Sequence, residues 1–595
     1  MSFYDSAMSK IYSEEDDFLI IGLTGRTGSG CSTVSNILSS KKDDITHSLI
    51  TEHTPKNNEE RKQRILFKYF DLNWEPFIKI QASAILTLSL AEDVDGHLID
   101  FIDENIEISS DSLNNEKELD ILKNKFKNIL EEIKTKNEET SGDLKRRIDF
   151  LNNYLIDINL KIKDLFKDKA NYIKLYQALG NNYRVSGNYY NTNFNDEFHG
   201  FFLAKKINKI IKELRELSKE SFNKTKKRNK LFIVIDAIRN PFEATYFQDR
   251  YSSFYLMAVS SEEKYRNKRL RNIGLTDDDI KEIDKKEYRK ASLDEEASYI
   301  YQNIQTCLEI SDIYIKNPEE KDIVCRYATL SNQLIKFVSL MRRPGIITPS
   351  SIERCMQIAY TAKLNSGCIS RQVGAAVSDS NFSIKSIGWN DVPSGQVPCS
   401  LRDRFDLSEG KDNIAYSEFE KNDEKFIHNI RNSKDKYIKL SEKGMRAPFC
   451  FKTEWNLVLD ENHKENVRRE YNLNDDQFNL INKIKSNSNQ VFTRSLHAEE
   501  NAFLQISKYG GLGIEGGILF TTASPCELCS KKAYQLGIKA IYYIDPYPGI
   551  AISNILNSGE NKPQLKLFHG AIGKAFHNFY TPRMSYKDEV AARIK

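Results

Sequence analysis

The chain has 595 residues, of which 40% are hydrophobic and 29% are charged. This composition excludes collagen-like, disordered and disulfide-scaffold proteins, and it supplies enough apolar surface for packed cores. The 87 basic and 84 acidic residues leave a net charge of +3, so the chain as a whole is not strongly attracted to nucleic acid. Its length corresponds to about three to five domains.

The cysteines and the N-terminal residues indicate the compartment. Nine cysteines are scattered along the chain, and an odd, scattered set argues against a disulfide framework. Residues 1–41 lack the basic start, apolar core and cleavage site of a secretory signal. No stretch of the sequence reaches the ~20 apolar residues that span a bilayer. We therefore expect a soluble cytoplasmic protein with no membrane partner.

Four short apolar segments predict buried strands in the N-terminal half: Phe18–Thr24, Leu231–Asp236, Phe254–Val259 and Asp312–Lys316. Helical stretches separate them, which is typical of a parallel α/β sheet. Residues 104–222 are rich in Lys, Glu, Asn, Leu and Ile at helical spacing, and they predict a helical subdomain inserted between the first two strands.

Arg342–Ser350 contains two prolines and a glycine and marks the clearest domain boundary. Beyond it we expect an amphipathic helix over Ser351–Asn365 and a hairpin formed by Gly374–Asp379 and Phe382–Trp389. The expected order is a parallel-sheet domain over 1–103 and 223–320, the helical insertion over 104–222, a linker helix and boundary over 321–350, and a second α/β domain over 351–595 with an insertion at 400–490.

A glycine-rich turn, GRTGSGCS, follows the first strand and leads into a helix. It matches the phosphate-binding pattern G-x-x-x-x-G-K-[ST] except that Cys31 replaces the lysine. Backbone N–H groups can still bind phosphate, and Ser32 could still contact a Mg²⁺ ion, but the lost cation weakens phosphoryl transfer. The candidate nucleotide-binding residues are Gly25, Gly28, Ser29, Gly30, Ser32, Thr33 and Asp236.

Other features near this turn have two interpretations. Asp236 ends the second strand, as the Mg²⁺-binding acid of a P-loop domain does. Arg266, Arg269 and Arg271 resemble the basic lid of nucleoside monophosphate kinases, although such a run is more often a solvated helix face. The alternative for the whole region is a strand–helix turn that binds no ligand.

The second set of motifs predicts a metal centre. His497 and Glu499 give H-x-E, and Pro525, Cys526 and Cys529 give P-C-x-x-C, which together are the signature of zinc-dependent nucleobase deaminases. Three protein ligands leave one zinc position open for water. Pro525 fits the first turn of a helix, whose N-terminus favours thiolates.

Glu499 is expected to transfer protons and not to bind the metal. The zinc would lower the pKa of a bound water, and attack on the amine-bearing carbon would give a uracil-type ring. The alternative is a structural zinc site, which would need neither Glu499 nor an open position.

The segments NSGCISRQVGAAVSD, SIGWNDVPSGQVPC, HAEENA and SPCELC resemble the dCMP deaminase branch of the cytidine deaminase superfamily. The resemblance covers about 351–400 and 495–545. It implies a five-stranded sheet flanked by helices, contact of Asn390 with the sugar, and a position near the nucleotide for Arg371. Without it, Asn390 is a turn residue and Arg371 a surface residue.

The resemblance also suggests a second, structural zinc. Cys368 and Cys399 align with positions that hold one in some relatives, and Cys450, His428 or His463 could complete the site. The alternative is that these cysteines are small core residues.

The order of a degenerate P-loop domain and a cytidine-deaminase-like α/β/α domain resembles the bacterial anti-phage dCTP deaminases. This resemblance implies Zn²⁺-dependent conversion of dCTP to dUTP, and also of dCMP to dUMP, which depletes dCTP during infection. It further implies a free deoxycytidine nucleotide as substrate, Mg²⁺ with a nucleotide at the loop, a homo-oligomer, and an inhibitory RNA or protein regulator.

Three other functions stay open. The first is a housekeeping dCMP deaminase of pyrimidine salvage regulated by nucleotides. The second is a polynucleotide base editor, which would need a basic channel lined by aromatic residues. The third is a non-enzymatic binding module.

Overall fold

The computed structural model divides the chain into two compact units, Met1–Ser350 with His569–Lys595 and Ser351–Phe568. The residues it describes are 17–45, 54–92, 98–105, 113–166, 168–190, 201–226, 229–288, 301–319, 323–458, 474, 477, 493–510, 513–545 and 551–594. Within them, no helix is long and apolar enough to cross a membrane.

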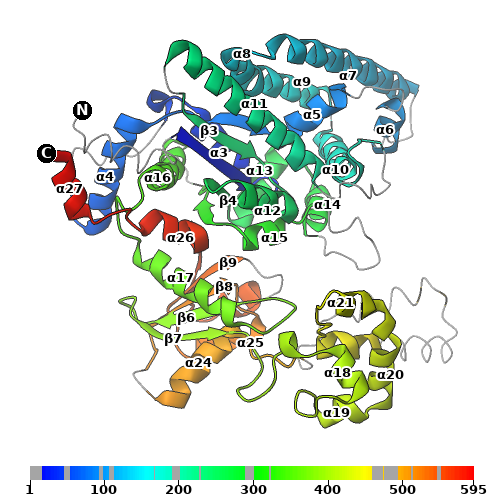
Figure 1. The fold of residues 1–595 in the computed structure, drawn as a ribbon, viewed down its shortest axis with the longest axis vertical. Helices are drawn as coiled ribbons and strands as arrows, with labels where there is room; N and C mark the ends of the chain where they lie inside the picture. Colours follow the sequence, from blue (N-terminus) through cyan, green and yellow to red (C-terminus); the bar gives the residue numbers. More distant parts are fainter. Residues whose placement is uncertain are drawn as a thin grey trace. The chain divides into compact units, whose positions relative to one another are not determined.

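The first unit is built on a six-stranded sheet in the order β11-β5-β4-β1-β3-β2 (Figure 1). Its strands are β1 (Phe18–Thr24), β2 (Ile78–Gln81), β3 (Leu231–Asp236), β4 (Phe254–Ser260), β5 (Ile313–Lys316) and β11 (Gly570–Ala571). The first five are parallel, and β11 is antiparallel to β5. The four expected strands are confirmed. The short strand β2 was missed because Lys79 and Gln81 interrupt its apolar pattern.

Helices cover both faces of this sheet. Ile20 and Ile233 face one hydrophobic cluster, and the alternate residues Ile21 and Val234 face the other, as the two-residue period of a strand requires. The first cluster is covered by α5 (Ala82–Glu92), α7 (Leu113–Thr140), α9 (Leu155–Leu165), α10 (Lys169–Ser186) and α11 (Phe202–Thr225). The second is covered by α3 (Cys31–Ser39), α4 (Asn58–Asn73), α16 (Ile323–Arg342) and α26 (Gly573–Tyr580).

The region expected as a helical insertion is helical where it is described, but it shares its core with the sheet. Phe126, Leu151 and Leu175 belong to the same cluster as Ile20 and Ile233. The remaining described helices of this unit are the 3-10 helix η1 (Lys42–Asp44), α6 (Leu98–Asn105), α8 (Leu144–Asp149), the π-helix η2 (Phe150–Tyr154), α12 (Pro241–Arg250), α13 (Glu263–Asn272), α14 (Asp277–Glu287), α15 (Ile304–Glu309) and α27 (Tyr586–Ile594).

Two expected boundaries differ from the structure. The helix expected as a linker within 321–350 is α16, which packs in the second cluster through Leu330, Leu334 and Phe337. The C-terminal segment 569–595 was assigned to the second domain but belongs to the first unit. It returns because β11 extends the first sheet and because Phe579 is fully buried in the second cluster.

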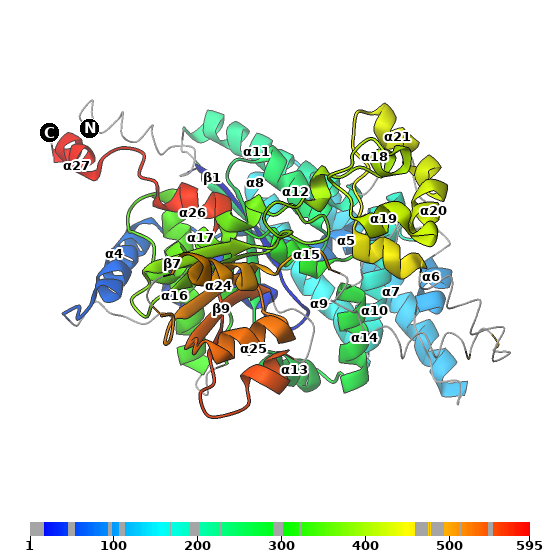
Figure 2. The same cartoon turned by 90° about the horizontal axis from the view of Figure 1, so that it is seen from below.

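The second unit contains the expected five-stranded sheet, in the order β10-β9-β8-β6-β7. Its strands are β6 (Gly374–Ser378), β7 (Ile384–Trp389), β8 (Ile518–Ala523), β9 (Ala540–Asp545) and β10 (Gln564–Leu567). The hairpin β6–β7 is confirmed, and β8, β9 and β10 run parallel to one another. The flanking helices include α17 (Ser351–Ala362), α24 (Ala498–Tyr509) and α25 (Glu527–Gln535). Figure 1 shows α17 and α24 on opposite sides of β7, and the three elements overlap in the view from below in Figure 2.

The insertion after β7 forms a small helical cluster of its own. Its helices include α18 (Arg404–Glu409), α19 (Glu418–Asn422), α20 (Glu424–Asn432) and α21 (Ile438–Glu442). Phe426 and Phe449 lie in its core, and the buried Arg404 pairs with Glu454 at 2.6 Å. Of the expected insertion at 400–490, residues 459–490 lie outside the described part apart from 474 and 477.

Substitution Phe579→Ala tests the assignment of the C-terminal segment to the first unit. Loss of this buried ring, which lies 5.0 Å from Tyr255 between ring centroids, should destabilise the first unit by ~3–5 kcal/mol. Hydrogen exchange followed by mass spectrometry should show lost protection in β4 and β5 but not in β8 and β9. The exposed His577→Ala is the control. Equal loss of protection in both sheets would contradict the assignment.

Candidate active site

His497, Cys526 and Cys529 converge at the N-termini of two helices. His497 is the N-cap of α24, Cys526 is the N-cap of α25, and Cys529 lies one turn further along α25. The Nδ1 atom of His497 is 3.2 Å from the Sγ of Cys526 and 3.5 Å from the Sγ of Cys529. Pro525 precedes the helix instead of entering its first turn, because α25 begins at Glu527.

The donor set fits a zinc ion. One imidazole nitrogen and two cysteine sulfurs have their ligand atoms within 4.8 Å of one another, and three such ligands are typical of catalytic zinc. Hydrogen bonds from Cys529 and His497 lower the pKa of Cys526. The hydrogen bond with Cys526 raises the pKa of His497. A lowered thiol pKa favours the thiolate form, which is the form that binds zinc.

Glu499 lies two residues beyond His497 and is only 4% exposed. Burial raises the pKa of its carboxyl group. The hydroxyl of Thr521, in β8, lies 3.1 Å from Glu499 Oε1 and can donate to it. Sequence reasoning missed Thr521, although it and Thr522 are the two polar residues of the buried strand β8.

Asn390 organises the loop that contains Arg371. Its Oδ1 accepts hydrogen bonds from Val373 N at 2.6 Å and from Ser366 Oγ at 2.9 Å. Its Nδ2 donates to the carbonyl oxygen of Arg371 at 2.7 Å. Asn390 is 9% exposed, so its observed role is to fix this loop. Contact of Asn390 and Arg371 with a nucleotide stays a prediction. Ser366, which has no motif of its own, was not anticipated.

Backbone contacts bring this loop beside the metal ligands. Leu496 N donates to Asp391 O at 2.8 Å, next to both Asn390 and His497. Gly374 N donates to Thr522 Oγ at 3.1 Å, next to Thr521. The loop that contains Asn390 and Arg371 is therefore hydrogen-bonded to residues next to His497 and Thr521.

Gly388 in β7 allows α24 to approach the sheet closely. A Cβ atom at this position would lie 2.3 Å from Ala498 O and 2.4 Å from Ala502 N. Both neighbours are backbone atoms of α24, so they cannot move without shifting the helix that begins at His497.

The described residues contain one cluster of three or more metal-ligating side chains, formed by His497, Cys526 and Cys529. Burial raises the pKa of Cys399, and the nearby Cys450 and Cys368 add to the same shift, so a second zinc at these cysteines stays a prediction. Arg494 Nη1 lies 3.9 Å from Cys399 Sγ. His428 instead contacts Asn432, and His463 lies outside the described residues.

The glycine-rich turn of the first unit joins β1 to α3 as expected. Gly30, at φ +110°, is the N-cap of α3, and no described side chain caps its first turn, which contains Ser32 and Thr33. A Cβ atom on Gly30 would lie 2.2 Å from Asn317 Nδ2. Gly28 has φ +84°, and Ser29 N closes a turn onto Arg26 O at 2.9 Å.

The other predicted residues near this turn are only partly brought together. Asp236 accepts a hydrogen bond from Ser35 Oγ at 2.9 Å, not from Ser32. Arg266 reaches the turn and donates to Thr27 O at 2.7 Å. Arg269 and Arg271 instead bond Ser261 and Asp277. Burial raises the pKa of Cys31 to about 12, so its thiol adds no charge. Which ligand the turn binds stays a prediction.

Comparison with known proteins agrees with the geometry of the second unit. Residues 349–545 match the model of the cytidine and deoxycytidylate deaminase zinc-binding region. The chain is 29% identical over 194 residues to a deoxycytidylate deaminase of Enterobacteria phage T2, covering 32% of this chain and 78% of that protein. The corresponding enzyme of phage T4 is 28% identical over 195 residues, covering 32% and 76%.

The chain also has a partial similarity to solved structures. The dCMP deaminase from cyanophage S-TIM5 in complex with dCMP and dUMP has 22% sequence identity and a TM-score of 0.20, over 37% of this chain and 99% of that one. The family match shows that the second unit contains a zinc-binding region of the cytidine and deoxycytidylate deaminase type.

Substitution Gly388→Ala should displace α24. Because His497 is the N-cap of this helix, its ring should move away from the two cysteine sulfurs, and the zinc content should fall. We expect less than half of the wild-type zinc by atomic absorption, since α24 can accommodate the methyl group only by shifting. The control is Gly513→Ala, because a Cβ atom there meets nothing within 4 Å. Full zinc occupancy in Gly388→Ala would show that α24 is not held by this contact.

Proposed function

We propose that this chain is a zinc-dependent hydrolytic deaminase of free deoxycytidine nucleotides that converts dCTP to dUTP, and also dCMP to dUMP. The observation that supports it best is the three-ligand cluster of His497, Cys526 and Cys529 beside the buried carboxyl group of Glu499. A structural zinc site would need no buried carboxyl group at this position. The family match over 349–545 supports the same class of reaction.

The residues of the site have separate roles in this reaction. His497, Cys526 and Cys529 would hold zinc, which supplies a lowered water pKa when it is bound. Glu499 accepts a proton from the attacking water and delivers it to the ring nitrogen N3. It then takes the proton of the new C4 hydroxyl group and gives it to the amino group, which leaves as ammonia while the C4=O bond forms. The Thr521 hydroxyl group, which lies 2.8 Å from Ala523 O and 3.1 Å from Glu499 Oε1, helps to position the Glu499 side chain.

The loop fixed by Asn390 provides the substrate contacts in this proposal. Asn390 has one Nδ2 hydrogen beyond the bond to Arg371 O, and we assign it to the deoxyribose. The Arg371 guanidinium group suits a phosphate oxygen. The net charge of +3 favours a free nucleotide over a polynucleotide.

The biological role that we propose is depletion of dCTP as a defence against phage, which starves viral DNA synthesis. Such an enzyme would be cytoplasmic, act as a homo-oligomer, and be restrained in healthy cells by an inhibitory RNA or protein. The alternative is a housekeeping dCMP deaminase of pyrimidine salvage. The two differ in whether the triphosphate is the preferred substrate.

We also propose that the glycine-rich turn binds the phosphates of a nucleoside polyphosphate accompanied by Mg²⁺. The supporting observation is the first turn of α3, which follows the parallel strand β1 and lacks a side-chain cap. Helix N-termini in this position bind phosphate through backbone N–H groups. Because Cys31 replaces the lysine, the role assigned to the turn is sensing and not phosphoryl transfer.

Substitution Glu499→Gln should lower kcat by ~10²–10⁴-fold because the amide cannot shuttle protons. Zinc content and thermal stability should stay at wild-type values, since the amide side chain has nearly the shape of the carboxylate and its oxygen can still accept from Thr521. Ammonia release is the measurement, and the exposed Glu515→Gln is the control. Full activity in Glu499→Gln would exclude the proposed chemistry.

A panel of cytosine nucleotides should separate the two biological roles. Under equal conditions, we expect faster ammonia release from dCTP than from dCMP, and a dUTP product by chromatography. Single-stranded DNA should give no release. A strict preference for dCMP would favour the salvage enzyme, and zinc measured on the same sample guards against a false negative.

A further inference from the structure

The glycine-rich turn is in contact with a carboxylate of its own chain. Glu287 ends α14 and is fully buried. Its Oε1 and Oε2 accept from Thr27 N at 3.1 and 3.2 Å, and the Thr27 hydroxyl group also donates to Oε1. Arg239 Nη1 lies 2.6 Å from Oε1. A backbone N–H, a hydroxyl and a guanidinium group are the donors that commonly bind a phosphoryl group.

A second carboxylate on the same helix neutralises the remaining arginines of the turn. Asp284 Oδ2 lies 2.6 Å from Arg26 Nη2 and 3.1 Å from Arg266 Nη1. Arg266 also bonds Thr27 O, so it is part of the turn. Three guanidinium groups thus surround the turn that lacks the usual lysine, and α14 supplies two anions to them.

The acid expected to face Mg²⁺ also has an internal counter-charge. Lys79, in β2, places its Nζ 3.9 Å from Asp236 Oδ2 and 2.7 Å from Asn36 Oδ1. Lys79 is 5% exposed. In the proposed site, the carboxylate of Glu287 therefore takes the place of a phosphate. The ammonium group of Lys79 lies near Asp236, the acid expected to face Mg²⁺.

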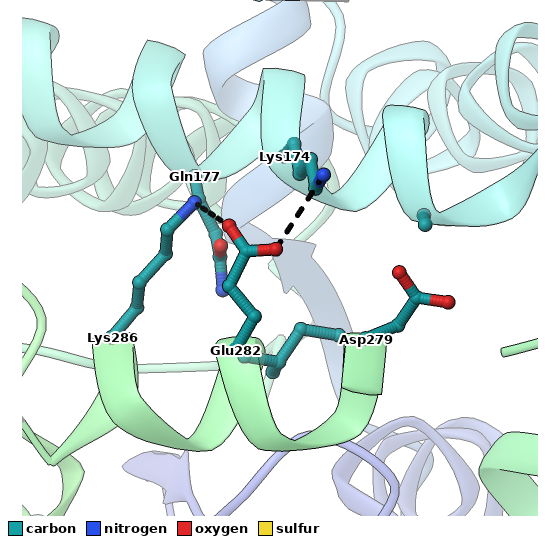
Figure 3. Close-up of a pocket in the computed structure, with 7 residues that line it drawn as sticks. Lys174, Gln177, Asp279, Glu282 and Lys286 are labelled. Atoms are coloured by element: carbon teal, nitrogen blue, oxygen red, sulfur yellow. Dashed lines mark ion pairs between the residues drawn. The ribbon is translucent and has the colours of Figure 1, made fainter. Parts of the chain in front are cut away.

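The opposite side of α14 is held independently of the turn. Ile280 and Ile283 pack with Ala170 of α10. In the small pocket between α10 and α14, the Glu282 carboxylate bridges Lys174 at 3.5 Å and Lys286 at 3.2 Å (Figure 3). Glu282 and Glu287 therefore lie on one helix but have different partners, which makes Glu282 a matched control.

We propose that α14 is an anion clamp: Glu287 and Asp284 hold the place of a polyphosphate, and a nucleoside polyphosphate that enters the turn displaces them. This inference rests on the proposed polyphosphate site. The phosphates take over the bonds of Thr27 N, Arg239 and Arg26, because two anions cannot share these donors. Nucleotide binding then releases the side of α14 that contacts the turn, while the other side stays packed against α10. A change in α14 on nucleotide binding can thus reach the helical region through α10.

The test is calorimetric titration of the full-length protein with ATP, with and without Mg²⁺, and with inorganic tripolyphosphate. Glu287→Gln should bind ATP about tenfold more tightly than wild type, which corresponds to ~1.4 kcal/mol, since the competing charge is removed. Glu282→Gln should bind like wild type. Tripolyphosphate should follow the same order if the phosphate chain is what is recognised, whereas an effect confined to ATP would assign recognition to the nucleoside.

Hydrogen exchange of α14 provides the second measurement. ATP should increase exchange over residues 277–287 in the wild type, and increased protection there would overturn the clamp. If Glu287→Gln does not fold, Asp284→Asn replaces it with the same expectation.

Other outcomes separate the two proposals. Equal ATP affinity in wild type and Glu287→Gln would overturn the clamp and leave the polyphosphate site standing. No ATP binding by any variant would overturn both. Ammonia release from dCTP on the same samples reports separately on the deaminase.

Discussion

The candidate active site depends on the close packing of α24 against β7. Gly388 lets the two backbones approach to a distance that no side chain would permit. That approach sets the position of His497 as the N-cap of α24 and directs Glu499 towards Thr521 in β8. The sulfur ligands follow β8: Cys526 is the N-cap of α25, and Cys529 lies in the first turn of that helix. One sheet thus fixes the ligands, the proton carrier and the loop held by Asn390.

The parts of the site that could be predicted are those set by local sequence. His497, Glu499, Cys526 and Cys529 occur in two short motifs. Each motif lies at a helix N-terminus, so the spacing of its residues determines their relative positions. Thr521, Ser366 and Gly388 could not be predicted, because their roles depend on contacts between segments far apart in the chain. The same holds for Asn390, whose hydrogen bonds to the Arg371 loop are visible only in the folded structure.

The fold follows the same division. Long apolar runs such as Phe18–Thr24 predicted their strands because burial on both faces leaves a clear pattern. Strand β2 escaped because it has four residues, one of them the buried Lys79. The packing of Phe579 in the first unit was not predicted, because the sequence of a short amphipathic helix does not indicate which hydrophobic core the helix packs against. At the glycine-rich turn, the sequence shows that Cys31 replaces the usual lysine. It does not show that Arg239 and Arg266 place positive charge at the turn or that Glu287 pairs with Arg239.

The central claim is hydrolytic deamination at the His497, Cys526 and Cys529 cluster, and isotope transfer from water tests it most directly. When dCTP is incubated with the zinc-loaded protein in ¹⁸O-labelled water, the account predicts dUTP with heavy oxygen on C4, together with ammonia. Mass spectrometry of the product distinguishes this oxygen from those of the phosphates. Release of ammonia without the label at C4, or no product from any deoxycytidine nucleotide on a zinc-loaded sample, would contradict the account.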